Sequence, residues 1–160
     1  MSITDDDLRH LERCIELAAE AVDAGDEPFG SVLVAADGTV LREDHNRVSG
    51  GDRTRHPELT LALWAAEHVP QAERGALTVY TSGEHCAMCS AAHAWAGLGR
   101  IVFATSTPQL VQWYADLGLA PGPVTPLRIT EVAPGIPVDG PVEQYAERVR
   151  ALHARHHSVA

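Results

Sequence analysis

Two short motifs, each at the start of an apolar, helix-like segment, constrain this chain more than any other feature. His56 and Glu58 flank Pro57 where a polar loop gives way to an apolar run, and Cys86 and Cys89 open a second such run. Residues i and i+3 share one face of a helix, so the two thiols can point at one ion from a first helical turn. The fold is therefore expected to bring the starts of two buried helices together.

Two thiolates and one imidazole form a ligand set that Zn²⁺ accepts. The free N–H groups at a helix N-terminus favour the thiolate form. Three protein ligands leave the fourth tetrahedral position open for water, as in catalytic zinc sites. Zinc lowers the pKa of that water to about 7, and a neighbouring carboxylate can take its proton. We expect one Zn²⁺ per chain, held by His56, Cys86 and Cys89, with a catalytic water and with Glu58 as the catalytic base.

Other histidines and a third cysteine offer alternatives. His93 follows Cys89 by one helical turn and could close a Cys₂His₂ structural site, which would make the chain a non-catalytic, zinc-stabilised interaction module. His85 precedes Cys86 and is expected at the edge of a substrate pocket or exposed, with zinc ligation as the alternative. Cys14 lies near the apolar stripe of an amphipathic segment, so we interpret it as a packed core residue.

Hydrophobic periodicity indicates an α/β chain, which we interpret as one domain over residues 1–160. Helices are expected at about residues 5–24, 58–68, 86–96 and 107–117, and from 142 onward, with 153–157 as a frayed polar end. Strands are expected at residues 29–35, 39–44, 77–81, 101–105 and 127–132. Asp37 and Gly38 predict a hairpin turn between the first two strands, whereas the later alternation of strands and helices predicts parallel neighbours.

Composition limits the partners. The chain has 160 residues, 45% of them hydrophobic, which suits one globular core. Twelve Arg, no Lys and 22 acidic residues give a formal charge of −10. This charge opposes nucleic acid, because affinity for phosphates comes from cationic side chains, so we expect a small-molecule substrate. Three cysteines do not suggest a disulfide framework, and no apolar run is long enough to span a membrane, so we expect a cytoplasmic protein without a membrane segment.

His56-x-Glu58 followed by Cys86-x-x-Cys89 resembles the signature of the cytidine deaminase superfamily of zinc hydrolases, which includes cytosine, guanine and tRNA adenosine deaminases. The likeness covers about residues 8–105. Residues 28–34 and 81–89 resemble the guanine deaminase branch, and residues 45–48 resemble the segment whose Asn binds the base. The resemblance implies a three-layer α/β/α fold around a five-stranded mixed sheet, and a homodimer.

The resemblance also implies a reaction, the hydrolytic deamination of an amino-heterocycle. Glu58 would deprotonate the zinc-bound water, protonate a ring nitrogen and pass a proton to the departing ammonia. Asn46 would orient the base through its amide, and Phe29 would either stack on the base or pack in the core. His85 is a further candidate for substrate contact, and Trp113 either reaches over the pocket or belongs to the core.

The expected substrate is a free nucleobase, a nucleoside or a related amino-heterocycle, with a purine-type, guanine-deaminase-like reaction favoured by the resemblance. Bacterial guanine deaminases of this type carry acidic residues after the fourth strand, whereas residues 105–109 of this chain are Thr-Ser-Thr-Pro-Gln. The resemblance therefore leaves the base itself open. A tRNA adenosine deaminase is the alternative enzyme, and a basic rim formed by Arg53, Arg55 and Arg100 would favour it.

Overall fold

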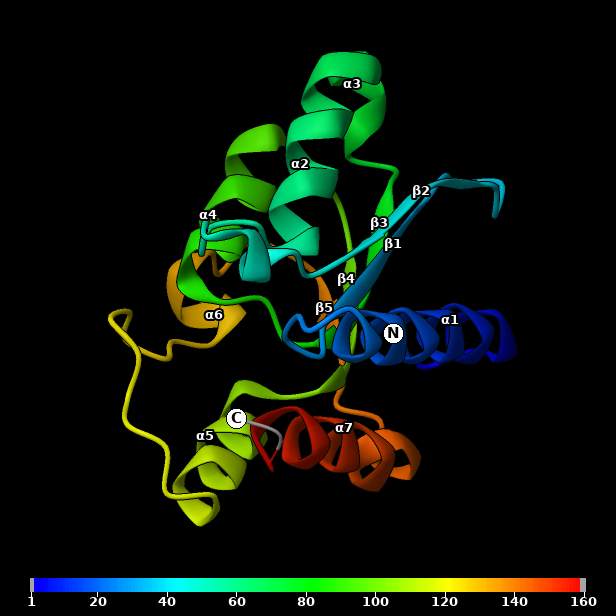
Figure 1. The fold of residues 1–160 in the computed structure, drawn as a ribbon. Helices are drawn as coiled ribbons and strands as arrows, with labels where there is room; N and C mark the ends of the chain where they lie inside the picture. The colour runs from blue at the N-terminus through cyan, green and yellow to red at the C-terminus, as the bar shows by residue number, and fades with distance from the viewer. Residues whose placement is uncertain (1, 159–160) are drawn as a thin grey trace.

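A five-stranded sheet with helices on both faces forms the centre of the computed structural model, which describes residues 2–158 (Figure 1). The strands are β1 (Gly30–Val34), β2 (Val40–His45), β3 (Thr78–Gly83), β4 (Ile101–Thr105) and β5 (Val138–Asp139). The helices are α1 (Asp5–Asp23), α2 (Pro57–His68), α3 (Gln71–Arg74), α4 (Ala87–Ala96), α5 (Thr107–Asp116), α6 (Ile129–Val132) and α7 (Ala146–Ser158), with short 3₁₀ helices at Val48–Gly50 and Glu143–Tyr145. The predicted three-layer architecture is confirmed.

The sheet is mixed, with the strand order β2-β1-β3-β4-β5. β1 pairs antiparallel with β2 across the predicted turn and antiparallel with β3, whereas β3, β4 and β5 run parallel. Ser31 near the start of β1 lies opposite Thr81 near the end of β3. The carboxyl ends of β3 and β4 and the start of β1 therefore meet at one edge of the sheet, and the two ligand-bearing loops lead away from this edge.

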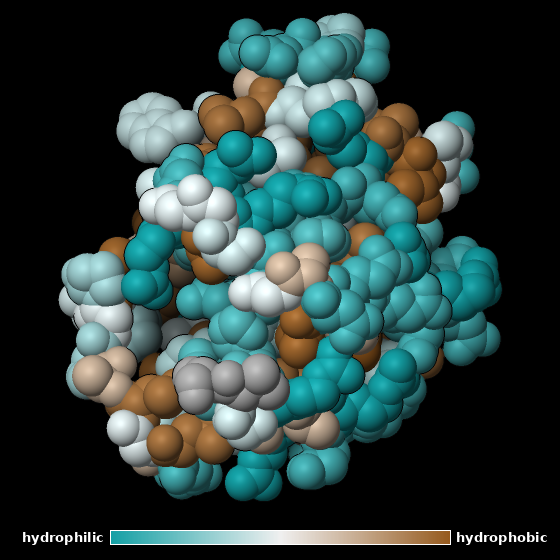
Figure 2. Space-filling model, in the orientation of Figure 1, coloured by the Kyte–Doolittle hydropathy of each residue, from teal (hydrophilic) through white to brown (hydrophobic). Residues whose placement is uncertain are grey.

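Side chains of β1 alternate between two cores, because successive residues of a strand point to opposite faces. Val32 and Val34 pack in a cluster with α1 and α7, and Leu33 packs in a second cluster with Leu61 of α2. Cys14 is fully buried in the first cluster, as expected. The outer surface is largely hydrophilic on the face shown in Figure 2.

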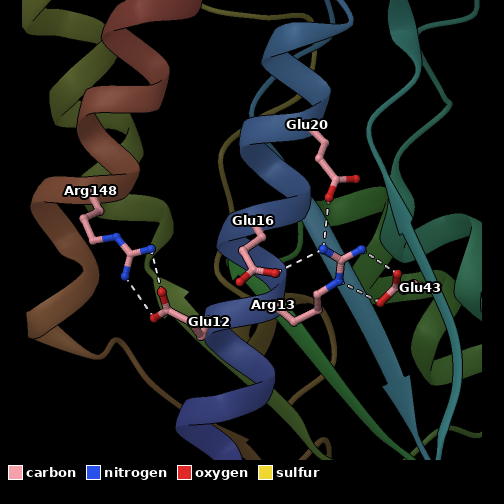
Figure 3. Close-up of polar contacts among 6 residues, drawn as sticks. All are labelled: Glu12, Arg13, Glu16, Glu20, Glu43 and Arg148. Carbon is pink, nitrogen blue, oxygen red and sulfur yellow. Dashed lines mark hydrogen bonds and ion pairs between the residues drawn. The ribbon is translucent and has the colours of Figure 1, made fainter.

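Ion pairs on the surface connect α1 to the elements beside it (Figure 3). Arg13 of α1 donates two hydrogen bonds, of 3.0 and 2.7 Å, to the carboxylate of Glu43 on β2, and it also contacts Glu16 and Glu20. Arg148 of α7 pairs with Glu12. Exposed ion pairs contribute little individually, so these contacts add little to the stability of the fold.

A more buried ion pair ties the start of α1 to the sheet. Arg100 Nη1 lies 2.9 Å from Asp7 Oδ1, and its Nε lies 2.8 Å from Asp139 Oδ2. Burial alone would raise the pKa of Asp7, but hydrogen bonds from Arg100, the Thr4 backbone and the Tyr80 hydroxyl hold that pKa well below its ordinary range. The Arg100 side chain is only 14% exposed, so this residue is unavailable for the basic rim.

The prediction of a strand over residues 127–132 is wrong. Ile129–Val132 form the short helix α6, and the fifth strand is Val138–Asp139 further along. The reason is a long-range contact, because the carboxylate of Glu84 accepts a hydrogen bond from the Ile129 N–H at 2.9 Å. Glu131 adds a local bond by accepting from the Arg128 N–H at 2.8 Å. Both contacts satisfy N–H groups at a helix start that would otherwise lack partners.

The expectation of a frayed polar end over residues 153–157 is also wrong. These residues belong to α7, and His153 is buried at 1% exposure. Its ring meets the Phe29 ring edge-on at 5.1 Å, and this aromatic contact fixes α7 against the segment that leads into β1. Among residues 2–158, no helix has both the length and the apolar character that a membrane crossing requires.

Candidate active site

His56, Cys86 and Cys89 meet at the edge of the sheet, with their ligand atoms within 4.8 Å of one another. His56 and Cys86 are the residues just before α2 and α4, and Cys89 lies in the first turn of α4. His56 Nδ1 is 3.5 Å from Cys86 Sγ and 3.6 Å from Cys89 Sγ. Zn–N and Zn–S bonds of about 2.0 and 2.3 Å in a tetrahedral site separate N from S by roughly 3.6 Å. The three residues therefore fit one zinc ion.

Among the three groups, only Cys86 is already in the form that binds a metal, because the pKa of the Cys89 thiol is raised by its hydrogen bond with Cys86 and by burial. A hydrogen bond from Cys89, together with His56, lowers the pKa of the Cys86 thiol to about 4. The hydrogen bond with Cys86 raises the pKa of His56 to about 9, whereas its burial acts in the opposite direction. The cluster thus holds a thiolate beside an imidazolium at neutral pH, and zinc binding would displace the remaining protons.

Glu58 lies one helical residue beyond Pro57 and is 6% exposed. Burial raises the pKa of its carboxyl group above the ordinary value. The Thr81 hydroxyl oxygen lies 3.0 Å from Glu58 Oε1 and the Ser31 hydroxyl oxygen lies 3.4 Å from it. The neighbouring strands β1 and β3 therefore hold this carboxylate in place. Its raised pKa suits a group that accepts and returns a proton near neutral pH.

A cavity of about 160 Å³ opens beside these groups. His56, Glu58 and Cys86 form its floor, and Phe29 lies in its wall. The remaining wall comes from Glu84, from the first turn of α5 and from residues 124–127, in the loop that crosses from α5 to α6 (Figure 1). Two of the three predicted metal ligands, the predicted base and one predicted substrate contact therefore line a single cavity, and Cys89 lies buried behind it.

Three other candidates do not line this cavity. The expectation of an exposed His85 is wrong, because this residue is 1% exposed and its ring lies edge-on against His93 at 5.5 Å. Trp113 is 8% exposed within the hydrophobic core, which favours the core alternative. Asn46 is 1% exposed, and its Oδ1 accepts from the backbone N–H of Val48 at 3.1 Å, while its Nδ2 has no partner among the described residues.

His93 does not close the metal site. Its Nε2 lies 2.7 Å from the Gly99 carbonyl oxygen, to which it donates a hydrogen bond. Within residues 2–158, His56, Cys86 and Cys89 form the one group of three or more potential ligands that converge. The ligand set therefore leaves a coordination position open.

Glu84 is a cavity residue whose role the sequence analysis missed. One carboxylate oxygen accepts from the Thr107 N–H at 2.8 Å and the other from the Ile129 N–H at 2.9 Å, so this side chain caps α5 and α6 together. Gln109, in the segment where acidic residues were expected, accepts from the Ser106 N–H at 2.7 Å and forms a capping box. The sequence signals for Glu84 were its place two residues before Cys86 and its place in residues 81–89, which resemble the guanine deaminase branch.

Comparison with known proteins identifies the class. The family described as the cytidine and deoxycytidylate deaminase zinc-binding region matches residues 4–105, which contain every metal ligand and Glu58. The chain belongs to this family and is a zinc-dependent deaminase, a hydrolase that acts on C–N bonds.

Individual relatives differ in their substrates. The chain is 34% identical over 119 residues to a probable cytosine deaminase of Schizosaccharomyces pombe, covering 74% of this chain and 72% of that one. It is 39% identical over 88 residues to the guanine deaminase of Bacillus subtilis, covering 54% and 56%. A solved structure of the guanine deaminase from Nitrosomonas europaea matches 96% of this chain and 87% of its own with a TM-score of 0.70 at 22% identity, which shows the shared fold.

Proposed function

We propose that this deaminase releases ammonia from a free nucleobase or a closely related amino-heterocycle, most favourably of the purine type. The observation that carries the proposal is the small cavity in which Glu58 faces the zinc ligands. Its volume of about 160 Å³ is below the roughly 300–1,000 Å³ of pockets for drug-sized ligands. Such a space suits one heterocyclic ring system better than a whole nucleoside.

Each of these residues has a separate role in the proposed reaction. Zinc held by His56, Cys86 and Cys89 would supply an activated water. Glu58 would take a proton from this water, deliver it to a ring nitrogen and then transfer a proton to the leaving ammonia. A carboxyl group with a raised pKa suits both directions of transfer. The hydroxyl groups of Thr81 and Ser31 hold one carboxylate oxygen of Glu58, and the residue lines the cavity.

Two residues are proposed to bind the base. Phe29 lines the cavity and offers an aromatic ring for contact with a planar heterocycle. The amide nitrogen of Asn46 lacks a partner among residues 2–158 but does not line the cavity in this structure. We propose that it donates to an acceptor atom of the base once the wall beside Phe29 moves. We assign no substrate contact to His85 or Trp113. The 39% identity to the B. subtilis guanine deaminase supports the purine type.

The two alternative functions receive less support. A tRNA adenosine deaminase would need a basic surface for phosphates, yet Arg100 is committed to Asp7 and Asp139 and the side chain of Arg53 lies 3.7 Å from Glu27. A closed structural zinc site would need a fourth protein ligand, and His93 donates its Nε2 hydrogen to a backbone carbonyl instead.

Glu58→Gln tests the proposal. Zinc-loaded wild type is expected to release ammonia from at least one of guanine, adenine, cytosine, their nucleosides, a pterin or an aminotriazine. The variant keeps the shape of the side chain but cannot shuttle the proton, so kcat/KM should fall by about 10²–10⁴-fold with one zinc per chain retained. Glu67→Gln, an exposed position on the same helix, is the control. Equal rates for Glu58→Gln and wild type, or silence of the zinc-loaded wild type across the panel, would overturn the proposal.

We also propose a homodimer and a cytoplasmic location. The neighbouring helices α2 and α4 each expose a large apolar side chain, with Leu63 at 59% and Trp95 at 91% exposure. Exposed apolar side chains of this size are typical of contact surfaces, and a second copy of the chain is the partner that we propose. Zinc-binding thiols favour a reducing compartment, and cell fractionation tests the cytoplasmic location.

A further inference from the structure

A second and larger cavity adjoins the first. It has a volume of about 630 Å³ and lies between α5 and residues 119–126 of the loop that follows this helix. Thr107 and Leu110 of α5, together with loop residues 124–126, line both cavities. The two spaces therefore share a wall, and a group attached to a ring in the first cavity has a short path into the second.

The lining of the second cavity is apolar. Its side chains include Leu110, Val111, Leu119 and Val124, and within the described residues no Arg, Lys, His, Asp or Glu takes part. The hydroxyl group of Tyr114 is already engaged, because it lies 3.2 Å from His153 Nδ1. Figure 2 shows hydrophobic side chains gathered at the lower left of the molecule, where Figure 1 places α5 and the loop that follows it.

This lining decides between classes of substituent. A phosphate group needs cationic side chains or a cluster of free N–H groups, and the Thr107 N–H is already bonded to Glu84. The hydroxyl groups of a ribose would lose hydrogen bonds to water, and apart from the engaged Tyr114 only Thr107 and Thr125 offer side-chain hydroxyl groups in this lining. An alkyl or aryl group would bind favourably in this cavity, because its burial removes apolar surface from water.

We propose that the second cavity is a subsite for an apolar substituent on the heterocycle that is deaminated. The ring lies in the first cavity against Phe29 and the zinc ligands, and an alkyl or aryl group of several carbons passes Leu110 into the second. This inference rests on the proposed function and narrows its substrate class to amino-heterocycles with an apolar group. The preferred substrate is therefore neither a nucleotide nor a ribonucleoside.

The test compares guanine and cytosine with their derivatives that carry methyl or butyl at a ring nitrogen, and with guanosine. Each buried methylene is worth about fourfold in kcat/KM, so the best butyl derivative is expected to exceed its methyl counterpart at least tenfold. The increase in kcat/KM over the unsubstituted base is expected to be smaller for guanosine than for the butyl derivative of guanine. The same comparison is made as Kd by calorimetry on zinc-loaded Glu58→Gln, which reports binding without turnover.

Two variants of α5 locate the effect. Ala115 is exposed and lines only the second cavity, so the ring of Ala115→Phe occupies part of this space. The kcat/KM of the butyl derivative should then fall close to that of the methyl derivative, so that the ratio of butyl to methyl is close to one. Gln112→Phe adds the same ring at an exposed position that lines neither cavity and should keep the wild-type ratio. Zinc content and melting temperature are measured for both variants.

The outcomes separate the two proposals. Turnover of an unsubstituted base without any gain from butyl, a larger gain from ribose than from butyl, or an unchanged ratio in Ala115→Phe overturns the subsite and leaves the proposed function standing. Absence of turnover for every compound overturns the proposed function. In that case equal Kd values for methyl and butyl derivatives overturn the subsite as well, and tighter butyl binding upholds it.

Discussion

Burial of His153 makes the stability of this protein depend on pH. The ring lies between Phe29, at 5.1 Å, and Tyr114, at 5.6 Å between ring centres. The Tyr114 hydroxyl lies 3.2 Å from Nδ1, to which it donates a hydrogen bond. Burial, together with the nearby His157 and His156, lowers the pKa of His153 to about 3. The folded protein therefore holds this imidazole in its neutral form.

The sign and size of the effect follow from proton linkage. Unfolded chains protonate histidine with a pKa of about 6.5. Because the folded pKa is lower, the contribution of His153 to stability is complete above pH 6.5 and is lost as the pH falls toward 3. Each pH unit in this window costs about 1.4 kcal/mol. At pH 5 the loss from this one side chain is about 2 kcal/mol, a large part of the stability of a small domain.

Urea unfolding of wild type and His153→Phe at pH 8 and pH 5 measures this loss. Phenylalanine keeps an aromatic ring beside Phe29 but cannot take up a proton. The Tyr114 hydroxyl loses its acceptor, which costs about 1 kcal/mol, but this cost is the same at both pH values. The free energy of unfolding of the variant relative to wild type should therefore increase by about 2 kcal/mol from pH 8 to pH 5.

His68→Gln removes an exposed histidine and controls for the loss of a histidine as such. Zinc release in acid would affect all three proteins alike, so the difference between wild type and His153→Phe should be the same with and without a chelator. A change below about 0.5 kcal/mol would show that His153 takes up a proton without leaving its site, and a change that His68→Gln reproduces would show that the effect is not specific to His153. Either result would refute the reasoning from burial.

Two other substitutions test the capping residue and the proposed dimer. Glu84→Gln leaves one acceptor oxygen for two backbone N–H groups, those of Thr107 and Ile129. The variant should keep its zinc, but its free energy of unfolding should be lower by about 1–3 kcal/mol and its KM should be higher. An unchanged melting temperature and an unchanged KM would contradict the capping role. Trp95→Arg places a charge on the apolar surface of α4 and should convert a dimer into monomers in sedimentation experiments, whereas a monomeric wild type would contradict the proposed dimer.

The metal site could be predicted because local spacing decides most of it. Cys86 and Cys89 share a helical turn wherever a helix begins at that motif, and Pro57 marks the start of the other helix just after His56. The pairing of the two helix starts required only the assumption that one ion uses all three ligands. Glu58 then follows His56 by two residues, so its position beside the ion needed no knowledge of the sheet.

The rest of the site depends on contacts between distant residues, which periodicity does not report. Residues 127–132 have the branched, apolar composition of a strand, yet the carboxylate of Glu84 fixes the N-terminus of a helix there. His153 belongs to a polar, His-rich end, and only the apolar surroundings of Phe29 and Trp113 explain its burial. Trp113 itself lies in the core because α7 covers it.

Part of the cavity wall lies outside the residues that the family match covers. Residues 4–105 contain the proposed zinc ligands and the proposed base Glu58, together with the capping residue Glu84. The remaining cavity wall, formed by α5 and residues 124–127, lies beyond this match. Relatives named for cytosine and for guanine both match this chain, over 119 and 88 residues. Glu84 joins the two parts, since its carboxylate sits in the matched region and fixes the start of both helices that carry the variable wall. A chimera in which residues 106–127 come from a relative should therefore have the substrate preference of that relative and should still bind one zinc ion per chain.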